Sequence, residues 1–326
     1  NARFFEISEV RREGEPTVTE QSKVVSKKLP IGISEVTVSK ENGLILFGST
    51  KTGTATDVWG YRYFSNGERR IQSAWFRWEL PGILKHHVIL DDVYYAVLKH
   101  GPHYTLEAYD VKKQTDTTVI DTNTIHLDTH SEVAALATST YNSTTNKTVF
   151  PKPTGYYETS KQLAVFNNNT GADLGRYGLV STNANGDLEV EGNWTGAKLI
   201  LGYVFEWLVE LPKLYVANIT GGEVRMDTRS SLVIHRLKFS FGAVGVIKTT
   251  LKRRGRTDYT EEYESLEWDR VQANTVSIAD EYVHTIPVYE NTKHLTVQLK
   301  SSHATPATLY SLNWEGDYNP KYYRRA

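Results

Sequence analysis

The sequence of 326 residues contains no cysteine, a single methionine and no marked excess of charge of either sign, since its formal net charge is −1. Without cysteine there are no disulfide bonds, thiolate metal sites or cysteine nucleophiles. A net charge close to zero gives no indication of nucleic-acid binding by overall electrostatic attraction. Long apolar runs are missing too, because the most apolar stretch, residues 197–216, is interrupted by Lys198, Glu206, Glu210 and Lys213. A membrane-spanning helix needs about 18 consecutive apolar residues.

Short apolar runs make up most of what is present. Runs of Val, Ile, Tyr and Thr, such as residues 35–38, 58–64 and 232–241, are separated by Gly, Asn, Asp or Pro. This spacing is typical of β-strands joined by short turns. No stretch has the periodicity of an amphipathic helix of three turns. The sequence therefore predicts an all-β protein built as sandwiches, barrels or propellers.

Residues 59–82, WGYRYFSNGERRIQSAWFRWELPG, predict an aromatic β-hairpin. Asn66-Gly67 between the two strands suits a tight turn with positive φ. Trp75 and Trp78 lie an odd number of positions apart, so their side chains should point to opposite faces of the second strand. We expect both indoles to be mostly buried, one in a core and the other at an interface between blades or subunits.

The chain falls into three parts by composition. Residues 32–110 divide into two similar units with the rhythm of propeller blades of about 40–50 residues, so residues 1–122 are predicted to be blades. Because a propeller needs at least four blades, the others would precede this chain. Residues 123–196 are polar, and the segments 139–148 and 167–175 predict long loops in a surface excursion or tip region. Apolar strands resume near residue 197, and residues 197–326 predict an antiparallel β-sandwich or barrel.

Two motifs that resemble ligand sites lack a required feature. The segment GSTKTGT at residues 48–54 imitates a phosphate-binding loop, but Thr54 occupies the position of the essential lysine. His86 and His87 are adjacent, and neighbouring side chains on a strand point to opposite faces, so they cannot hold one metal ion together. We predict no cofactor-binding or metal-binding residue.

Acidic pairs occur at Asp91-Asp92 and Glu261-Glu262, as expected of turns and exposed edges. A glycosidase would need two carboxylates held about 5–10 Å apart in a cleft. The sequence does not exclude that arrangement, but it contains no G-x-S-x-G nucleophile motif. We predict no catalytic residue and a protein that is not an enzyme.

A basic run, KRRGR, occupies residues 252–256. It is compatible with an exposed turn, with a contact to an acidic neighbouring subunit, or with a contact to passing DNA. A continuous positive lining would hold a duplex by counterion release, so a conduit for DNA should not be strongly basic.

Several blocks together resemble the tail tubular protein B family, the nozzle proteins of short-tailed, T7-like bacteriophages. The block SAWFRWEL at residues 73–80 and the strand run that follows it are similar to one of the family's propeller blades. Residues 199–216 and 232–246 are similar to the entry into its final domain. The C-terminal residues 306–325, PATLYSLNWEGDYNPKYYRR, resemble its terminal signature, in which Trp314 would pack inside the domain.

The resemblance implies a structural subunit of the virion tail, produced in the bacterial host cytoplasm. The subunits would form a homohexameric ring beneath an adaptor ring of tail tubular protein A, with tail fibre protein attached at the side. Double-stranded DNA would pass through during ejection without sequence-specific binding. A full-length member should be much longer, so this chain resembles a C-terminal portion. The alternative is a carbohydrate-binding or polysaccharide-degrading β-propeller protein of the phage tail.

The same terminal block carries two finer expectations. Glu315-Gly316 should form a turn, and residues 318–325 should lie on the surface, because a tail rich in tyrosine and arginine has the composition of an interaction surface. The predicted interface residues are Trp75, Trp78, Arg253, Arg254, Arg256, Tyr318, Tyr322, Tyr323, Arg324 and Arg325.

Overall fold

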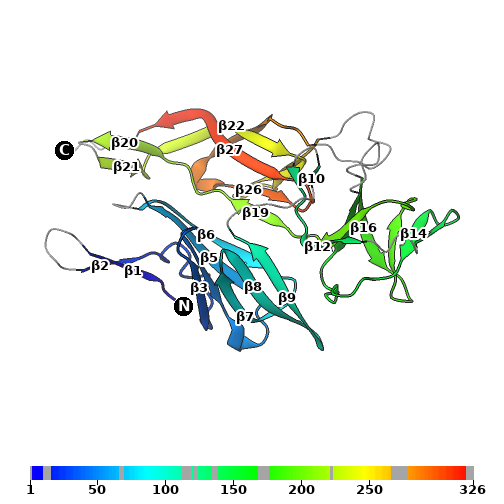
Figure 1. The fold of residues 1–326 in the computed structure, drawn as a ribbon. Coiled ribbons are helices and arrows are strands. Elements are labelled where there is room, and N and C mark those ends of the chain that lie inside the picture. Colours follow the sequence, from blue (N-terminus) through cyan, green and yellow to red (C-terminus); the bar gives the residue numbers. More distant parts are fainter. Residues whose placement is uncertain are drawn as a thin grey trace, which may run out of the picture. The chain divides into compact units, whose positions relative to one another are not determined.

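The structure is a computed structural model, and it describes residues 2–9, 16–65, 70–111, 119–120, 123–133, 139–167, 176–220, 223–265 and 278–320. These residues form antiparallel strands with two short 3-10 turns, η1 (Thr50–Thr52) and η4 (Thr292–His294), which confirms the all-β prediction (Figure 1). In this part of the chain, no helix is long and apolar enough to cross a membrane. The chain divides into unit 1, Asn1–Thr115 with Pro153–Ser160, and unit 2, Asp116–Lys152 with Lys161–Ala326.

Unit 1 begins with a hairpin and continues into a four-stranded meander. The predicted aromatic hairpin is confirmed as the last two strands of this sheet, while its turn residues Asn66-Gly67 lie outside the described residues. The first hairpin consists of β1 (Phe5–Glu9) and β2 (Pro16–Glu20), and the sheet has the order β3 (Glu35–Ser39), β4 (Leu44–Gly48), β5 (Asp57–Ser65) and β6 (Arg70–Glu79).

A second meander in unit 1 shares its core with the first. It consists of β7 (Ile83–Leu90), β8 (Val93–His100) and β9 (His103–Asp110). Leu46 and Val58 of the first sheet are buried in one cluster with Leu84, Tyr94 and Leu98 of the second. Strand β8 alternates strictly between partly buried and buried positions, so that one of its faces contributes to this core. Two consecutive meanders that pack together suit propeller blades, and the propeller itself stays a prediction.

Unit 2 contains a seven-stranded sheet in which two neighbouring strands, β15 (Leu163–Asn167) and β18 (Leu199–Tyr203), are entirely buried. Its order is β12 (Asp128–Val133), β18, β15, β16 (Tyr177–Thr182), β17 (Leu188–Glu191), β14 (Lys147–Phe150) and β13 (Thr140–Asn142). A separate two-stranded sheet consists of β10 (Val119–Ile120) and β11 (Asn123–Thr124).

This sheet corrects part of the sequence prediction. The segment 139–148, predicted as a long loop, forms the β13–β14 hairpin, because its polar strand residues pair with β14 and β14 in turn pairs with β17. Of the second predicted loop, residues 168–175 lie outside the described residues. Strand β18 pairs with both β12 and β15, so a boundary near residue 197 would separate strands of one sheet. The three-part division of the chain stays a prediction.

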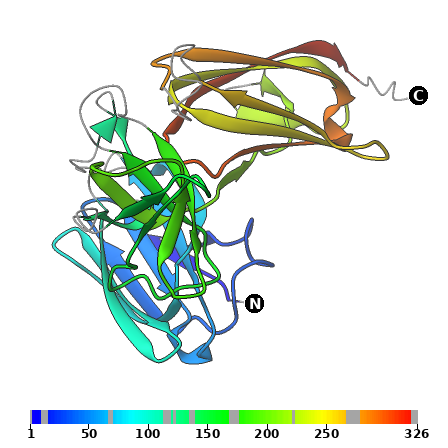
Figure 2. The same cartoon turned by 90° about the vertical axis from the view of Figure 1, so that its right-hand side faces the viewer.

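The rest of unit 2 is a β-sandwich, as predicted for the C-terminal part (Figure 2). Alternating residues of its long strands, including Phe239, Phe241, Leu251, Ile286 and Leu299, fill the core between the two sheets. One sheet has the order β19 (Trp207–Glu210), β26 (Leu295–Ser301), β23 (Val246–Arg253) and β24 (Tyr259–Glu264). The other sheet has the order β25 (Tyr282–Asn291), β22 (Ser231–Val244) and β27 (Ala307–Asn319). A separate hairpin pairs β20 (Val216–Thr220) with β21 (Glu223–Asp227).

Candidate functional site

The two predicted tryptophans lie on opposite faces of β6, as predicted. Trp75 packs against the cluster that contains Phe47 and Tyr61, and its indole N–H donates to the carbonyl oxygen of Gln21 at 2.9 Å. Trp78 packs against the core shared by the two meanders. Both indoles are partly buried and neither is fully buried, because β6 is an edge strand of its sheet.

The N-terminal residues cover the aromatic face that carries Trp75. The ring of Phe4 lies 5.4 Å from Phe47, 5.4 Å from Tyr61 and 6.0 Å from Trp75, in edge-to-face arrangements between ring centroids. Such pairs add about 0.5–1.5 kcal/mol each beyond the area that they bury. Much of this aromatic surface is therefore covered by other residues of unit 1. An interface role for Trp75 and Trp78 stays a proposal.

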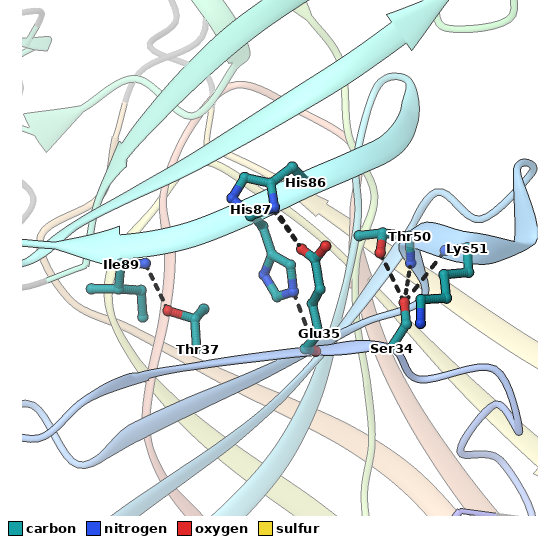
Figure 3. Close-up of polar contacts among 8 residues, drawn as sticks. All are labelled: Ser34, Glu35, Thr37, Thr50, Lys51, His86, His87 and Ile89. Atoms are coloured by element: carbon teal, nitrogen blue, oxygen red, sulfur yellow. Dashed lines mark hydrogen bonds and ion pairs between the residues drawn. The ribbon is translucent and has the colours of Figure 1, made fainter.

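Side chains of β3 accept hydrogen bonds from the backbone of β7 and so join the two meanders (Figure 3). The Glu35 carboxylate accepts the N–H of His87 at 3.1 Å, and Thr37 Oγ1 accepts the N–H of Ile89 at 2.7 Å. His86 Nδ1 lies 3.0 Å from the same carboxylate. Because β3 and β7 are edge strands of their sheets, the side chains of Glu35 and Thr37 accept the β7 N–H groups that the carbonyl groups of a neighbouring strand would otherwise accept.

Burial dominates the electrostatics of this contact. It lowers the pKa of His87 and raises the pKa of Tyr94, because each charged form would lose its hydration. Burial also raises the pKa of Glu35, but the hydrogen bonds from His87 and His86 more than offset it and hold that pKa below its usual value. His87 Nδ1 and the Tyr94 hydroxyl are buried without a hydrogen-bond partner among the described residues.

The histidine pair behaves as the strand geometry predicts. His86 is exposed and His87 is buried, so their rings point to opposite sides of β7 (Figure 3). Throughout the described ranges, no group of three or more potential ligands could hold a metal ion. The pair serves the contact between β3 and β7.

The phosphate-like loop at residues 48–54 is a local turn stabilised by a serine. Ser34 Oγ accepts the backbone N–H groups of Thr50 at 3.0 Å and Lys51 at 3.3 Å (Figure 3). The Thr50 hydroxyl lies 2.8 Å from the same Oγ. Because Ser34 already satisfies these amides, they are not directed at an anion. This agrees with the missing lysine at Thr54.

Both acidic pairs occupy the turn and edge positions that the sequence predicts. Asp91 and Asp92 have φ of 48° and 62° and form the β7–β8 turn, a left-handed conformation that Asp tolerates better than most residues. Asp92 Oδ1 also accepts from the Asn42 amide at 2.6 Å. Glu261 and Glu262 lie on the edge strand β24, where Glu261 accepts the Tyr259 hydroxyl at 3.2 Å.

The basic run covers the last two residues of β23 and the exposed turn that follows it, before β24. The Arg253 guanidinium donates to the carbonyl oxygen of Thr257 at 3.1 Å. Arg256 lies 3.7 Å from the Glu290 carboxylate, and Arg254 is exposed. An exposed turn, one of the predicted alternatives, is therefore present, and the role of Arg253, Arg254 and Arg256 at an interface stays a proposal.

The C-terminal block differs from its prediction in two respects. Trp314 is 38% exposed instead of packed inside, because β27 is the edge of its sheet and leaves the indole without a neighbouring strand. Glu315-Gly316 is not a turn: both residues belong to the continuous strand β27 and pair with β22. The predicted interface residues Tyr322, Tyr323, Arg324 and Arg325 lie outside the described residues.

Tyr318 is partly buried and closes the end of the sandwich. Its hydroxyl donates to Asp227 at 2.8 Å. Hydrogen bonds from the backbone of Ser230, from Tyr318 and from the backbone of Arg229 lower the pKa of Asp227 to about 2. Periodicity does not reveal this contact, since Asp227 and Tyr318 lie 91 positions apart.

Comparison with known proteins agrees with the resemblance found in the sequence. A family model described as bacteriophage nozzle protein matches residues 2–325, which is nearly the whole chain. Among curated proteins, none matches the chain.

Proposed function

Because the chain belongs to the bacteriophage nozzle protein family, we propose that it is a structural subunit of the tail nozzle, assembled as a homohexameric ring through which double-stranded DNA is ejected. The family match over residues 2–325 carries this proposal. The near-neutral net charge supports it, since a strongly positive channel would hold the duplex.

A closed ring requires two different complementary surfaces on each subunit, because every copy contacts one neighbour on either side. The C-terminal tail after β27 would contact the adaptor ring of tail tubular protein A, and tail fibre protein would attach at the side. Deletion of residues 320–326 should leave unit 2 folded but weaken co-assembly with the adaptor. Unchanged co-assembly after this deletion would contradict the assignment of the tail.

Electron microscopy and mass photometry of the complete protein test the proposal directly. We expect six-membered rings with a central channel and no release of sugar from host capsule. A monomer that degrades capsular polysaccharide would instead support the alternative of a carbohydrate-acting propeller. The local structural contacts of Asp92 and Glu261 favour a non-enzymatic role for both acidic pairs.

A further inference from the structure

One end of the sandwich in unit 2 gathers positive side chains from segments that are far apart in the sequence. The backbone N–H of Arg254, in the β23–β24 loop, donates to the carbonyl oxygen of His294 in η4 at 3.0 Å. Lys213 Nζ donates to the carbonyl oxygen of Lys293 at 2.5 Å. We call this surface the basic end, and it consists of Lys213, Lys252, Arg253, Arg254, Arg256 and Lys293.

Of the basic end, Arg256 has a carboxylate partner, Glu290 at 3.7 Å, and the remaining charge is largely uncompensated. Lys213, Arg253 and Lys293 donate to backbone carbonyl oxygens, with Lys293 Nζ 3.3 Å from the carbonyl of Arg229. A carbonyl orients a cationic head group but does not neutralise it. Lys252 and Arg254 are exposed and have no carboxylate partner within the described ranges. Such clustered cations repel one another, so a surface that retains them is prepared for an anionic partner.

An acidic surface lies on the strand that follows the basic loop. Glu261, Glu262 and Glu264 belong to β24, which is an edge strand of the same sheet. Glu262 and Glu264 are exposed, and Lys248 lies 3.2 Å from Glu262. Glu262 and Glu264 are two positions apart and lie on the same face of β24, and we call these two glutamates the acidic edge. Each copy of the chain therefore carries a positive and a negative surface on neighbouring elements of one sandwich.

We propose that the basic end of one copy docks on the acidic edge of the next copy. A protein surface fits better than a nucleic acid, because a phosphate backbone is negative along its whole length and would be repelled by the adjacent acidic edge. A second copy supplies the complementary charge in the required place. Two different surfaces in contact form a head-to-tail interface, which is the type that a ring requires. This inference rests on the proposed ring assembly.

A charge-swap experiment on the complete protein tests the contact. The first variant, Lys252→Glu with Arg254→Glu, makes the basic end acidic, and the second, Glu262→Lys with Glu264→Lys, makes the acidic edge basic. Each variant alone should repel its own copies and assemble at least about tenfold more weakly than wild type in analytical ultracentrifugation. An equimolar mixture should regain assembly, because the reversed end of one then faces the reversed edge of the other.

The matched control is Lys40→Glu with Lys51→Glu, which makes the same charge change at exposed positions of unit 1 and should assemble like wild type. Circular dichroism establishes that each variant is folded. The single substitution Arg254→Gln, which removes one charge, provides a milder test, and a salt titration of the wild type provides another. Assembly of the wild type should weaken as salt is raised from about 0.05 to 0.5 M, because salt screens exposed charges.

The inference is wrong if both folded variants assemble like wild type, or if the mixture is no better than either variant alone. It is also wrong if the first variant loses affinity for a fluorescent DNA duplex while its assembly is unchanged, since the basic end would then bind nucleic acid. If the wild type forms rings and the folded variants form them equally well, only this inference is overturned. A wild type that remains monomeric overturns both the inference and the proposed nozzle function.

Discussion

His303 shows how a single partly buried residue links the two parts of unit 2. It lies in the β26–β27 connection, where its ring packs 4.1 Å from that of Tyr177. The backbone N–H of Thr305 donates to its Nδ1 at 3.3 Å. The next residue, Ala304, is fully buried in the cluster of Phe166 and Ile200 beneath the seven-stranded sheet. Burial lowers the pKa of His303 to about 4, because the imidazolium would lose its hydration.

This pKa predicts a loss of stability in acid. The unfolded chain takes up a proton near pH 6.5 and the folded chain only near pH 4, so stability is fully present above about pH 6.5 and falls as the pH drops toward 4. The contribution of His303 reaches at most about 3 kcal/mol. We expect His303→Gln to flatten the pH dependence of urea unfolding over this range. Parallel curves for wild type and variant would contradict the assignment.

Trp75 and Trp78 should both stabilise unit 1, although through different neighbours. We expect each alanine substitution to reduce the free energy of unfolding by about 2–4 kcal/mol, slightly less than for a fully buried tryptophan. Trp75→Phe should cost only about 1 kcal/mol, because it keeps a packed ring and loses the hydrogen bond to Gln21. Thermal and urea unfolding measure these differences. Wild-type stability in both alanine variants would count against this packing of the two indoles.

At the scale of elements, unpaired strand edges decide much of the structure. The edge of β7 is satisfied by Glu35 and Thr37 from β3, while β6 and β27 leave tryptophans partly exposed at their edges. A side chain that accepts from a neighbouring strand is restricted to one register, because the N–H groups of an edge alternate in direction. The β3–β7 contact therefore fixes how the two meanders align within unit 1.

Thr37→Val tests this contact with little change of shape. The substitution keeps the branched side chain but removes the acceptor for the Ile89 N–H, which would lose its partner in a partly buried position. We expect a loss of about 1–3 kcal/mol of stability and faster hydrogen exchange at Ile89. The control is Thr37→Ser, which retains the oxygen and should keep the Ile89 amide protected. Equal protection in Thr37→Val and wild type would show that another acceptor replaces the hydroxyl.

At the scale of the whole molecule, charge distribution matters more than net charge. The chain carries a formal charge of −1, although unit 2 gathers a basic end and an acidic edge on one sandwich. We predict that carboxylates outnumber Lys and Arg on the channel surface of the assembled nozzle. Each cation there would bind a phosphate with release of counterions and so slow DNA exit. A structure of the assembled ring with more channel-facing cations than carboxylates would refute this.

The sequence by itself determined the features that depend on neighbouring residues. Short β-favouring runs between turn residues predicted the all-β class and the aromatic hairpin. The two-residue period of a strand predicted the opposite orientations of Trp75 and Trp78, because strand geometry is local. The positions of Asp91 and Asp92 in a turn followed from the same local rules. The family resemblance also came from short contiguous blocks such as residues 73–80.

Only the tertiary structure decided what depends on pairing between distant segments. The polar hairpin at residues 139–148 is a strand pair because β17 supplies an edge for it, and Trp314 is exposed because β27 has no neighbour on one side. Glu35 and His87, which are in contact, lie 52 positions apart in the sequence. The gathering of Lys213 and Arg254 at one end of the sandwich likewise joins distant segments. Local patterning carries no information on such pairings, since strand order is set by packing of the whole sheet.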